Sequence, residues 1–293
     1  MKKYAVGADI GGHHVKTAII DLDSFQIIKE SEVYIEVREY EPAETILSAW
    51  AEAINTSVEK AINHSGIHLE AIDGVGLAIP GPFDYADGVS LMKHKFASLY
   101  IKNVREELAI RTYFKAENIK FKNDAESFLL GAVLMKQDPS IKEAIGVTLG
   151  TGFGSAFYSN KDSSDANLWC TPYKGGIAED FISTRWFVKR YNELTKKEIK
   201  GAVDLYNTIN TDPYAQQIFN EFGETLYDFL VPLVVETKAD TLVLGGNINK
   251  ASKYFIEPLE KELSAEGVKL IIAEGTEIVA LAGAGSLLKN LDN

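Results

Sequence analysis

Cysteine is almost absent from this chain, because Cys170 is the single one among 293 residues. One thiol can form neither an intrachain disulfide nor a cysteine-rich metal site, and such a composition is typical of reducing compartments. No run of 18 apolar residues is present to span a membrane. The N-terminal residues also lack the apolar core of a signal peptide. We therefore expect a cytoplasmic protein without a membrane partner.

Positive charge is also in short supply, with 30 Lys and Arg against 42 Asp and Glu. The formal net charge is -12 and no basic stripe stands out, so we expect no nucleic-acid partner. Two common nucleotide-binding signatures are missing, since neither G-x-x-x-x-G-K-[ST] nor G-x-G-x-x-G occurs. An acidic protein can still bind ATP, because backbone N–H groups and a metal ion outweigh its overall charge locally.

The most informative pattern that is present is an internal repeat. Residues 5–18 read AVGADIGGHHVKTA, and residues 144–157 read AIGVTLGTGFGSAF. Each segment looks like a strand, a glycine turn and a returning strand. Glycine-rich hairpins can resemble each other by chance, but two matching units in one chain favour a pair of duplicated α/β domains.

Helical and strand-like segments alternate around the repeat, which is typical of α/β proteins. The predicted helices cover residues 43–64, 103–110, 125–136, 179–195, 214–236 and 278–288. The predicted strands outside the repeat cover residues 74–79, 117–122, 241–246 and 268–273, and residues 161–167 read as a polar loop. We expect an N-terminal domain of residues 1–121 plus 276–293, and a C-terminal domain of residues 122–275.

Three glycine clusters follow strand-like segments, at Gly11–Gly12, Gly150–Gly152 and Gly245–Gly246. Glycine lets the backbone approach a phosphate closely, with N–H groups pointing at it, and Thr151 adds a hydroxyl to the second cluster. Each cluster alone is more typical of an ordinary turn. The three together, in this order, predict a nucleotide-binding site.

Polar residues around the first glycine cluster extend the predicted nucleotide site. Asp9 ends the first strand and is suited to hold Mg²⁺ through water. Lys16 is suited to meet a phosphate oxygen, although a solvated surface lysine is an equally good interpretation. His13 completes the turn and is counted with the nucleotide-binding candidates, although a single histidine there is more typical of a polar turn.

Asn123 and Asp124 directly follow a strand-like segment and open a helical one. A carboxylate at the end of a strand is well placed to act as a catalytic base. Asn and Asp are also the residues that most often cap a helix N-terminus, and position alone favours this second interpretation.

Six motifs, taken together, resemble the ROK (repressor, open reading frame, kinase) family of sugar kinases over nearly the whole chain. They are DIGG (9–12), AIPGPFDYADG (78–88), NDAE (123–126), TLGTGFGSAF (148–157), LGGNI (244–248) and ALAGAGSLL (280–288). The resemblance implies two duplicated actin-like (ribonuclease H-like) ATPase domains with a central cleft, a homodimer, and phosphoryl transfer from Mg·ATP to a sugar. The fourth motif and Lys16 are more similar to the polyphosphate/ATP glucokinase branch, so polyphosphate is a second possible donor.

The resemblance also implies roles for individual residues. Asp124 matches the family's catalytic base, and Asn123 matches a neighbouring sugar-binding residue. Glu179 matches a Glu that touches the sugar, and Gly81 lies in a turn that matches a loop closing over it. Nucleotide contacts are implied at the glycine clusters, namely Gly11, Gly12, Gly150, Thr151, Gly152, Gly245 and Gly246.

The departures from the family concern mainly the sugar half of the site. His13 stands where the family usually has Thr or Ser, and residues 167–170 read NLWC where the family has E-x-G-H. The family's zinc site uses that His and three Cys, so no zinc site is expected here. Two alternatives to a kinase remain, a non-catalytic sugar sensor and a nucleotide-binding pseudokinase. The family's repressors carry an N-terminal DNA-binding extension, which is not expected because the first strand begins at Lys3.

Overall fold

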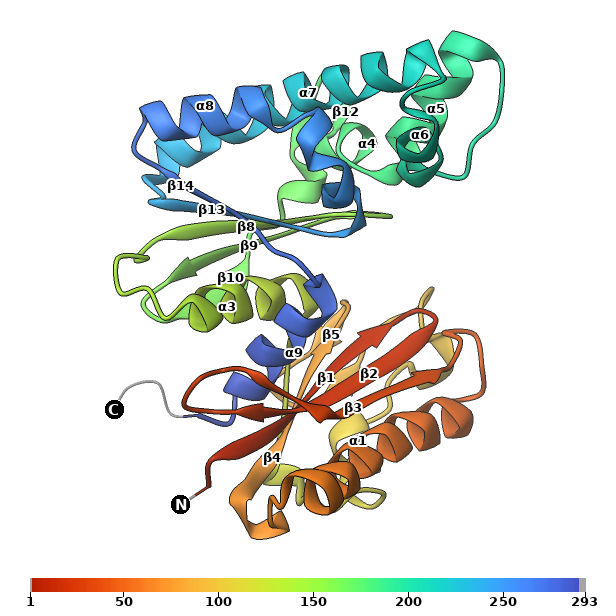
Figure 1. Ribbon diagram of the computed structural model, residues 1–293. Coiled ribbons are helices and arrows are strands. Elements are labelled where there is room, and N and C mark those ends of the chain that lie inside the picture. The colour runs from red at the N-terminus through yellow and green to blue at the C-terminus, as the bar shows by residue number, and fades with distance from the viewer. Residues whose placement is uncertain (1, 290–293) are drawn as a thin grey trace. The chain divides into compact units, whose positions relative to one another are not determined.

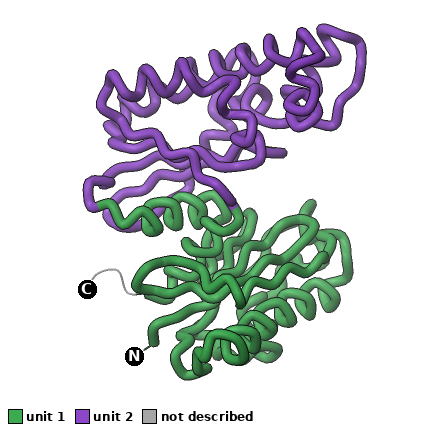
Figure 2. Tube along the Cα trace, viewed as in Figure 1, with its two compact units in different colours: residues 1–138, 277–293 green, residues 139–276 purple. Residues whose placement is uncertain are grey.

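The computed structural model describes residues 2–289, which form two compact units (Figures 1 and 2). Within the described residues, the first unit comprises residues 2–138 and 277–289, and the second comprises Pro139–Thr276. Each unit is built around a five-stranded sheet and has its own apolar core.

The sheet of the first unit has the strand order β3-β2-β1-β4-β7. Its strands are β1 (Tyr4–Gly11), β2 (His14–Asp21), β3 (Ile27–Glu36), β4 (Ile72–Ile79) and β7 (Ile119–Asn123). Strands β1 to β3 pair antiparallel as successive hairpins, whereas β4 runs parallel to β1 and β7 runs parallel to β4. The parallel strands end at one edge of the sheet, where Asp9 pairs with Ala78 and Ile79 pairs with Asn123.

Helices cover both faces of β1 in the first unit. The helices are α1 (Ala43–Ser65), α2 (Val104–Ala109), α3 (Asp124–Lys136) and α9 (Thr276–Ser286), and a short hairpin of β5 (Phe83–Asp84) and β6 (Val89–Ser90) follows β4. On one face, Val6 and Ala8 share a core with Trp50 of α1. On the other face, Gly7 lies so close to α9 that a Cβ would overlap the Leu281 carbonyl oxygen. Because β1 is covered on both sides, its sequence is apolar almost throughout.

The second unit repeats the same sheet order, β10-β9-β8-β13-β14. Its strands are β8 (Ala144–Leu149), β9 (Phe153–Ser159), β10 (Asp162–Asp165), β13 (Thr241–Gly245) and β14 (Lys269–Ile272), and a separate hairpin pairs β11 (Pro172–Tyr173) with β12 (Gly176–Ile177). Its helices are α4 (Ala178–Phe181), α5 (Thr184–Thr195), α6 (Ala202–Thr208), α7 (Pro213–Thr237) and α8 (Glu257–Ala265). The apolar residues of β8 pack with those of α5 and α7 in one core.

The matching sheets confirm the α/β class and the duplication predicted from the internal repeat. In both units two antiparallel hairpins are followed by two parallel strands on the other side of the first strand. The repeated segments are the first hairpins, β1–β2 and β8–β9. Their turns differ in length, since Gly11 pairs with His14 in the first hairpin and Leu149 pairs with Phe153 in the second.

Three sequence expectations differ from the structure. Residues 161–167 are not all loop, because β10 pairs with β9 at the edge of the second sheet. The single helix expected over residues 179–195 is broken into α4 and α5, because the backbone N–H and the hydroxyl of Thr184 both donate to the Gly150 carbonyl oxygen (2.8 and 2.9 Å). The first domain boundary lies after Asp138, not after residue 121, because α3 packs tightly against α9 at Gly131.

Candidate functional site

Carboxylates gather at the carboxyl edge of the first sheet around Asp9. The pKa of Asp9 is raised to about 8, mainly because burial disfavours the charged carboxylate. The negative charges of Asp124 and Glu277 raise this pKa further, and Lys16 opposes them. The first strand, the third helix and the last helix of the unit therefore each bring an acidic side chain to one region.

Lys16 is the cation of this cluster and lies opposite Asp9 on the neighbouring strand. Its Nζ lies 3.4 Å from Glu32 Oε2 and 3.7 Å from Glu277 Oε2, and its side chain is only 16% exposed. It is therefore not the solvated surface lysine that the sequence left as an alternative. Its contact with a phosphate stays a prediction.

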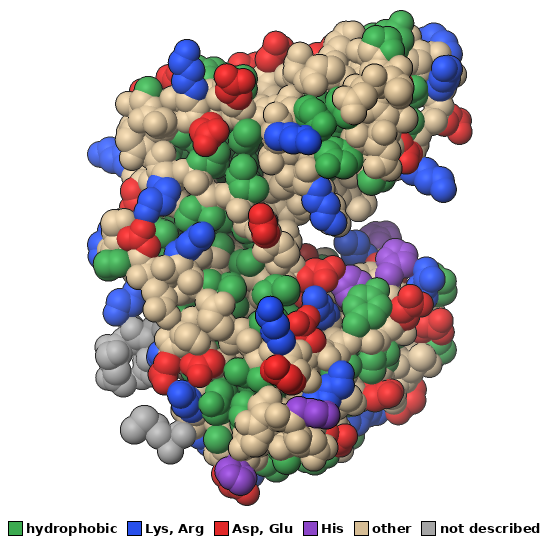
Figure 3. All heavy atoms as spheres, in the orientation of Figure 1, with side chains coloured by type: hydrophobic (Ala, Val, Ile, Leu, Met, Phe, Trp, Pro, Cys, Tyr) green, Lys and Arg blue, Asp and Glu red, His purple; other side chains and the backbone are tan. Residues whose placement is uncertain are grey.

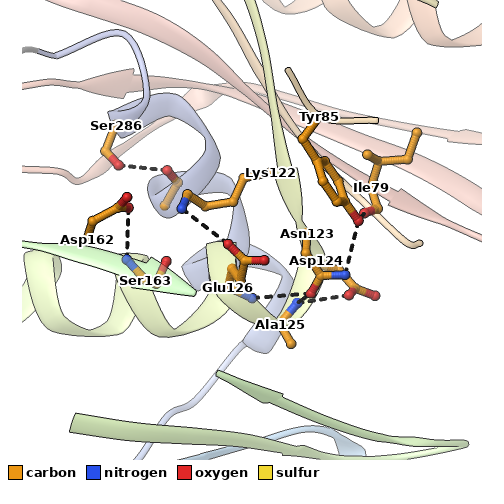
Figure 4. Close-up of polar contacts among 11 residues, drawn as sticks. Ile79, Tyr85, Lys122, Asn123, Asp124, Ala125, Glu126, Asp162, Ser163 and Ser286 are labelled. Atoms are coloured by element: carbon orange, nitrogen blue, oxygen red, sulfur yellow. Dashed lines mark hydrogen bonds and ion pairs between the residues drawn. The ribbon is translucent and has the colours of Figure 1, made fainter. Parts of the chain in front are cut away.

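Asn123, at the end of β7, caps helix α3 and is held in one orientation (Figure 4). Its Oδ1 accepts from the N–H groups of Ala125 (2.9 Å) and Glu126 (3.4 Å), which satisfies two of the helix's free donors. Its Nδ2 donates to the Tyr85 hydroxyl (3.2 Å), which in turn donates to the Ile79 carbonyl oxygen (3.2 Å). The amide is thus fixed from both ends.

Asp124 is the first residue of α3, so the capping role weighed for it from sequence belongs to Asn123. Asp124 Oδ1 accepts from the Ala125 N–H at 2.8 Å (Figure 4). A carboxylate at this position is stabilised by the positive end of the helix dipole. Its role as the catalytic base remains a prediction.

Gly81 belongs to the same neighbourhood, because a Cβ added to it would lie 3.4 Å from the Tyr85 hydroxyl. Tyr85 therefore links two predicted sugar-binding residues, Gly81 and Asn123. Sequence reasoning missed Tyr85, although it lies inside the AIPGPFDYADG motif, because a tyrosine six residues beyond a strand gives no local signal of where its hydroxyl bonds.

The turn at Gly11, Gly12 and His13 joins β1 to β2 and is hydrogen-bonded to the segment after β3. The Glu39 N–H donates to the Gly12 carbonyl oxygen (2.9 Å), and the Val37 N–H donates to that of His13 (3.2 Å). A Cβ added to Gly12 would lie 2.6 Å from Glu39 Oε2. An acidic side chain thus lies against a turn that was predicted to receive phosphate.

The second glycine turn, Gly150 to Gly152, joins β8 to β9 and lies beside Glu179 of α4. Thr151 is exposed, and a Cβ on Gly150 would meet no atom within 4 Å. Glu179 Oε2 accepts from the Phe153 N–H at 3.0 Å. A Cβ on Gly152 would lie 2.8 Å from this same oxygen.

The third glycine cluster lies directly against the second within the same unit. Gly245 ends β13 and pairs with Thr148, two residues before Gly150. Gly246 has a φ of 93°, and a Cβ there would overlap the backbone of Leu149. The structure therefore brings the predicted residues together in two groups. Asp9, Lys16 and Asp124 gather in the first unit, and the Gly150 and Gly245 clusters with Glu179 gather in the second.

Variants of two glycines in the second unit, Gly246 and Gly152, distinguish a structural role from a binding role. We expect Gly246→Ala to lower Tm, because positive φ costs about 1–3 kcal/mol and the new Cβ meets backbone. That cost corresponds to roughly 2–4 °C per kcal/mol for a domain of this size. Gly152→Val should lower Tm less, because its Cβ meets only the end of a flexible side chain, yet it should weaken binding of the non-hydrolysable ATP analogue AMPPNP.

Thermal melts and calorimetric titration of both variants check this expectation. Gly12→Val is the matching change in the first unit and should likewise weaken AMPPNP binding. Unchanged affinity in Gly12→Val and Gly152→Val would mean that the phosphates bind elsewhere.

The described residues contain no group of three or more His, Cys, Asp or Glu side chains placed to enclose a metal ion. Mg²⁺ does not require such a group, because it keeps several waters and usually binds one or two carboxylates together with substrate phosphates. Asp9 fits this mode, since two further carboxylates raise its pKa and a cation would offset their charge. The absence of a zinc site remains a prediction.

The segment that replaces the family's E-x-G-H motif is ordered by aromatic packing. Tyr173 stacks edge-to-face on Phe181 and Phe229, with ring centroids 5.4 Å apart in each pair. Cys170 is exposed, and its thiol donates to the Asn167 carbonyl oxygen at 3.3 Å. Tyr173 therefore packs within this segment, whereas Trp169 is 45% exposed.

The duplicated sheets and the acidic strand ends define the two-domain actin-like ATPase fold that the motifs predicted. The ROK family profile matches residues 5–165, and the chain belongs to this family. The glucokinase of Thermotoga maritima is 21% identical over 97% of this chain and 96% of its own length. The N-acetyl-D-glucosamine kinase of Pasteurella multocida is 25% identical over 88% of each chain.

Solved structures agree on the fold. A ROK family glucokinase from Streptomyces griseus, in complex with glucose and AMPPNP, superposes with a TM-score of 0.74 at 18% identity, over 97% of this chain and 98% of that chain. On the face drawn in Figure 3, acidic and basic side chains are interspersed. None of the helices among residues 2–289 is long and apolar enough to cross a bilayer.

Proposed function

We propose that this protein is an ATP-dependent sugar kinase in which Asp124 is the general base. The observation that carries the proposal is the placement of Asp124 at the start of α3, beside the capping residue Asn123 and within electrostatic reach of Asp9. Membership of the ROK family supports it, because the similar proteins named above are a glucokinase and an N-acetylglucosamine kinase.

In the proposed reaction the sugar hydroxyl oxygen bonds to the γ-phosphorus of ATP while the bond from that phosphorus to the β–γ bridging oxygen breaks. The hydroxyl proton passes to the Asp124 carboxylate, and ADP leaves. Asn123 orients the sugar through the N–H of its amide that Tyr85 does not take. A fixed amide costs little entropy when the sugar binds, which favours one sugar orientation.

The glycine turns and Asp9 act on the phosphates in this proposal. In this proposal the turns Gly11–Gly12 and Gly150–Gly152 offer backbone N–H groups to phosphate, except the N–H of Gly150, which donates to the Gly152 carbonyl oxygen (3.1 Å). Lys16 adds a positive charge. Mg²⁺, when bound beside Asp9, supplies charge that stabilises the transferring phosphoryl group. We propose ATP as the donor, with polyphosphate as the alternative, and a homodimer as the assembly.

The sugar is proposed to be a hexose or an N-acetylated amino sugar, in keeping with the substrates in the names of the similar proteins. Efficient use of plain glucose is not expected, because residues 167–170 lack the Glu and His of the E-x-G-H motif. A site that has lost such hydrogen-bonding groups discriminates less between sugars.

A coupled assay of ADP formation tests the proposed function. Glucose, mannose, N-acetylglucosamine and N-acetylmannosamine are each offered with Mg·ATP, and the phosphorylated product is identified by mass spectrometry. We expect turnover with one sugar of this group well above that with glucose. Turnover of glucose alone, at the level of a dedicated glucokinase, would contradict the expected preference. Absence of sugar-dependent ADP formation across a wide panel would contradict the kinase assignment.

A nucleotide- or sugar-binding pseudokinase or sensor is the second candidate. Glu39 favours it, because its carboxylate lies against Gly12 where a phosphate is expected and repels one there. His13, in place of the family's Thr or Ser, removes a hydroxyl from the same turn. Calorimetry separates the two functions, since a sensor binds sugar or AMPPNP but forms no product in the panel.

A further inference from the structure

An ion pair lies against the second glycine turn and is not accounted for by the roles assigned so far. Glu179 Oε1 is paired with the guanidinium of Arg185, near the start of α5. The other oxygen of the same carboxylate accepts from the Phe153 N–H at 3.0 Å. One anionic group is thus held between a backbone N–H of the turn and an arginine.

This geometry is the one that a phosphate group adopts at an anion site. A phosphate also presents two or more oxygens, which accept from backbone N–H groups on one side and from an arginine fork on the other. Arg185 keeps 64% of its side chain exposed, so its guanidinium can accept an incoming anion. The carboxylate occupies the position that suits a phosphate oxygen.

We propose that Arg185 is a phosphate-binding residue of the nucleotide site, and that the Glu179 carboxylate holds this position until phosphate replaces it. The inference rests on the proposed function, because it takes the Gly150–Gly152 turn as the phosphate turn. On phosphate binding, the Phe153 N–H and the Arg185 guanidinium exchange their hydrogen bonds to the Glu179 carboxylate for hydrogen bonds to phosphate oxygens. Glu179 is then released from the turn, and its carboxylate becomes available for the sugar contact that the family resemblance implies.

Arg185 is not required to hold α5 in place. The helix is anchored by Thr184, which donates twice to the Gly150 carbonyl oxygen, and by Phe187, which is fully buried. Lys189 lies one turn further along α5, and both Arg185 and Lys189 line a cavity of about 780 Å³. It carries the same charge as Arg185, so Lys189→Gln is a matched control for the loss of one positive charge.

A purely structural role for Arg185 makes a different prediction from a phosphate contact. If Arg185 only neutralises Glu179, then Arg185→Gln weakens nucleotide binding by leaving an unpaired carboxylate at the turn. In that case Arg185→Gln has no effect once Glu179 is replaced by Gln. A direct phosphate contact predicts an effect in both backgrounds, and a double-mutant cycle separates the two cases.

The experiment is calorimetric titration of Mg·AMPPNP, without sugar, into the wild type, Arg185→Gln, Glu179→Gln, the double variant and Lys189→Gln. We expect Arg185→Gln to weaken binding about 10–100-fold in either background, the size of one charge-assisted hydrogen bond. Glu179→Gln alone should bind at least as tightly as wild type, because the competing group has lost its charge. Lys189→Gln should stay within about 3-fold of wild type, the scale of an exposed charge. Unchanged melting temperatures check folding.

Two results overturn the proposal. In the first, Arg185→Gln does not weaken binding in the Glu179→Gln background, which leaves Arg185 as a neutralising partner only. In the second, Glu179→Gln alone weakens binding, which means that the carboxylate assists the anion. A wild type that fails to bind Mg·AMPPNP at all contradicts the proposed function itself, and so is distinct from both.

Discussion

Asp124→Asn is expected to lower kcat for sugar phosphorylation by about 10²–10⁴-fold, the usual contribution of a general base. The amide has nearly the same shape as the carboxylate but cannot accept the hydroxyl proton. AMPPNP affinity should change little, and Tm should hold, because Asn123 rather than Asp124 caps α3. Steady-state kinetics with the sugar found in the panel, together with calorimetry and thermal melts, measure these quantities.

Glu126 offers a matched control two residues further along the same helix. It is also a carboxylate in the first turn of α3, and it pairs with Lys122 at 3.3 Å. Glu126→Gln should leave kcat near the wild-type value. Near-wild-type turnover in Asp124→Asn would remove the base role from Asp124, and an equal loss in Glu126→Gln would point to a general electrostatic effect.

Asp9→Asn is expected to make the protein more stable at pH 8 while impairing phosphoryl transfer. The pKa of Asp9 is about 8 in the folded protein, against 3.8 for an ordinary Asp. Between these values the folded protein binds a proton that the unfolded chain has released, so stability falls as pH rises from about 4 to 8. Asn carries no such penalty. Each pKa unit is worth about 1.4 kcal/mol, which makes the gain on the order of a few kcal/mol.

Denaturant unfolding at pH 5 and pH 8 measures this difference. The variant should gain over wild type mainly at the higher pH, and an equal gain at both values would contradict the raised pKa. Binding provides a second readout, because a carboxyl that is protonated at pH 7 should lose its proton to the buffer when a magnesium–nucleotide complex binds beside it. The binding enthalpy of Mg·AMPPNP should then depend on the ionisation enthalpy of the buffer in wild type, and less so in Asp9→Asn.

Asp124→Asn also serves as a check on the Asp9 prediction. The charge of Asp124 is the second cause of the raised pKa of Asp9, after burial. Removing the charge of Asp124 should lower the pKa of Asp9, so fewer protons should be released per nucleotide bound at pH 7.

Much of the fold could be predicted from sequence, because it depends on local patterns that occur twice. The repeated strand–turn–strand segments became the β1–β2 and β8–β9 hairpins, and the flanking helices lie near their expected residues. Strand β10 was missed because its residues are polar, and an edge strand with an exposed face needs few apolar side chains. The break between α4 and α5 depends on the distant Gly150 carbonyl, which helix periodicity cannot reveal.

The site was predictable where a motif carried it and not where contacts are long-range. Asn123 and Asp124 adjoin each other, but which of them caps the helix was settled only by the bonds from Ala125 and Glu126. Glu277 was missed because its effect on Asp9 crosses more than 260 residues of sequence. Arg185 was missed because its ion pair with Glu179 depends on where α5 begins.

The last helix, α9, governs when during synthesis the first unit can be completed. It packs on β1, β4 and α3 so closely that a Cβ on Gly76 would overlap the Ala284 carbonyl oxygen, and its first turn carries Glu277 to Asp9. A ribosome-bound chain makes Asp9 and Asp124 early, yet the apolar surface beneath α9 stays uncovered until this helix emerges. The second unit lies between these two segments of the sequence, so it can fold before the first unit is complete. The carboxylate cluster around Asp9 is therefore complete only after α9 has been made and has packed against the sheet.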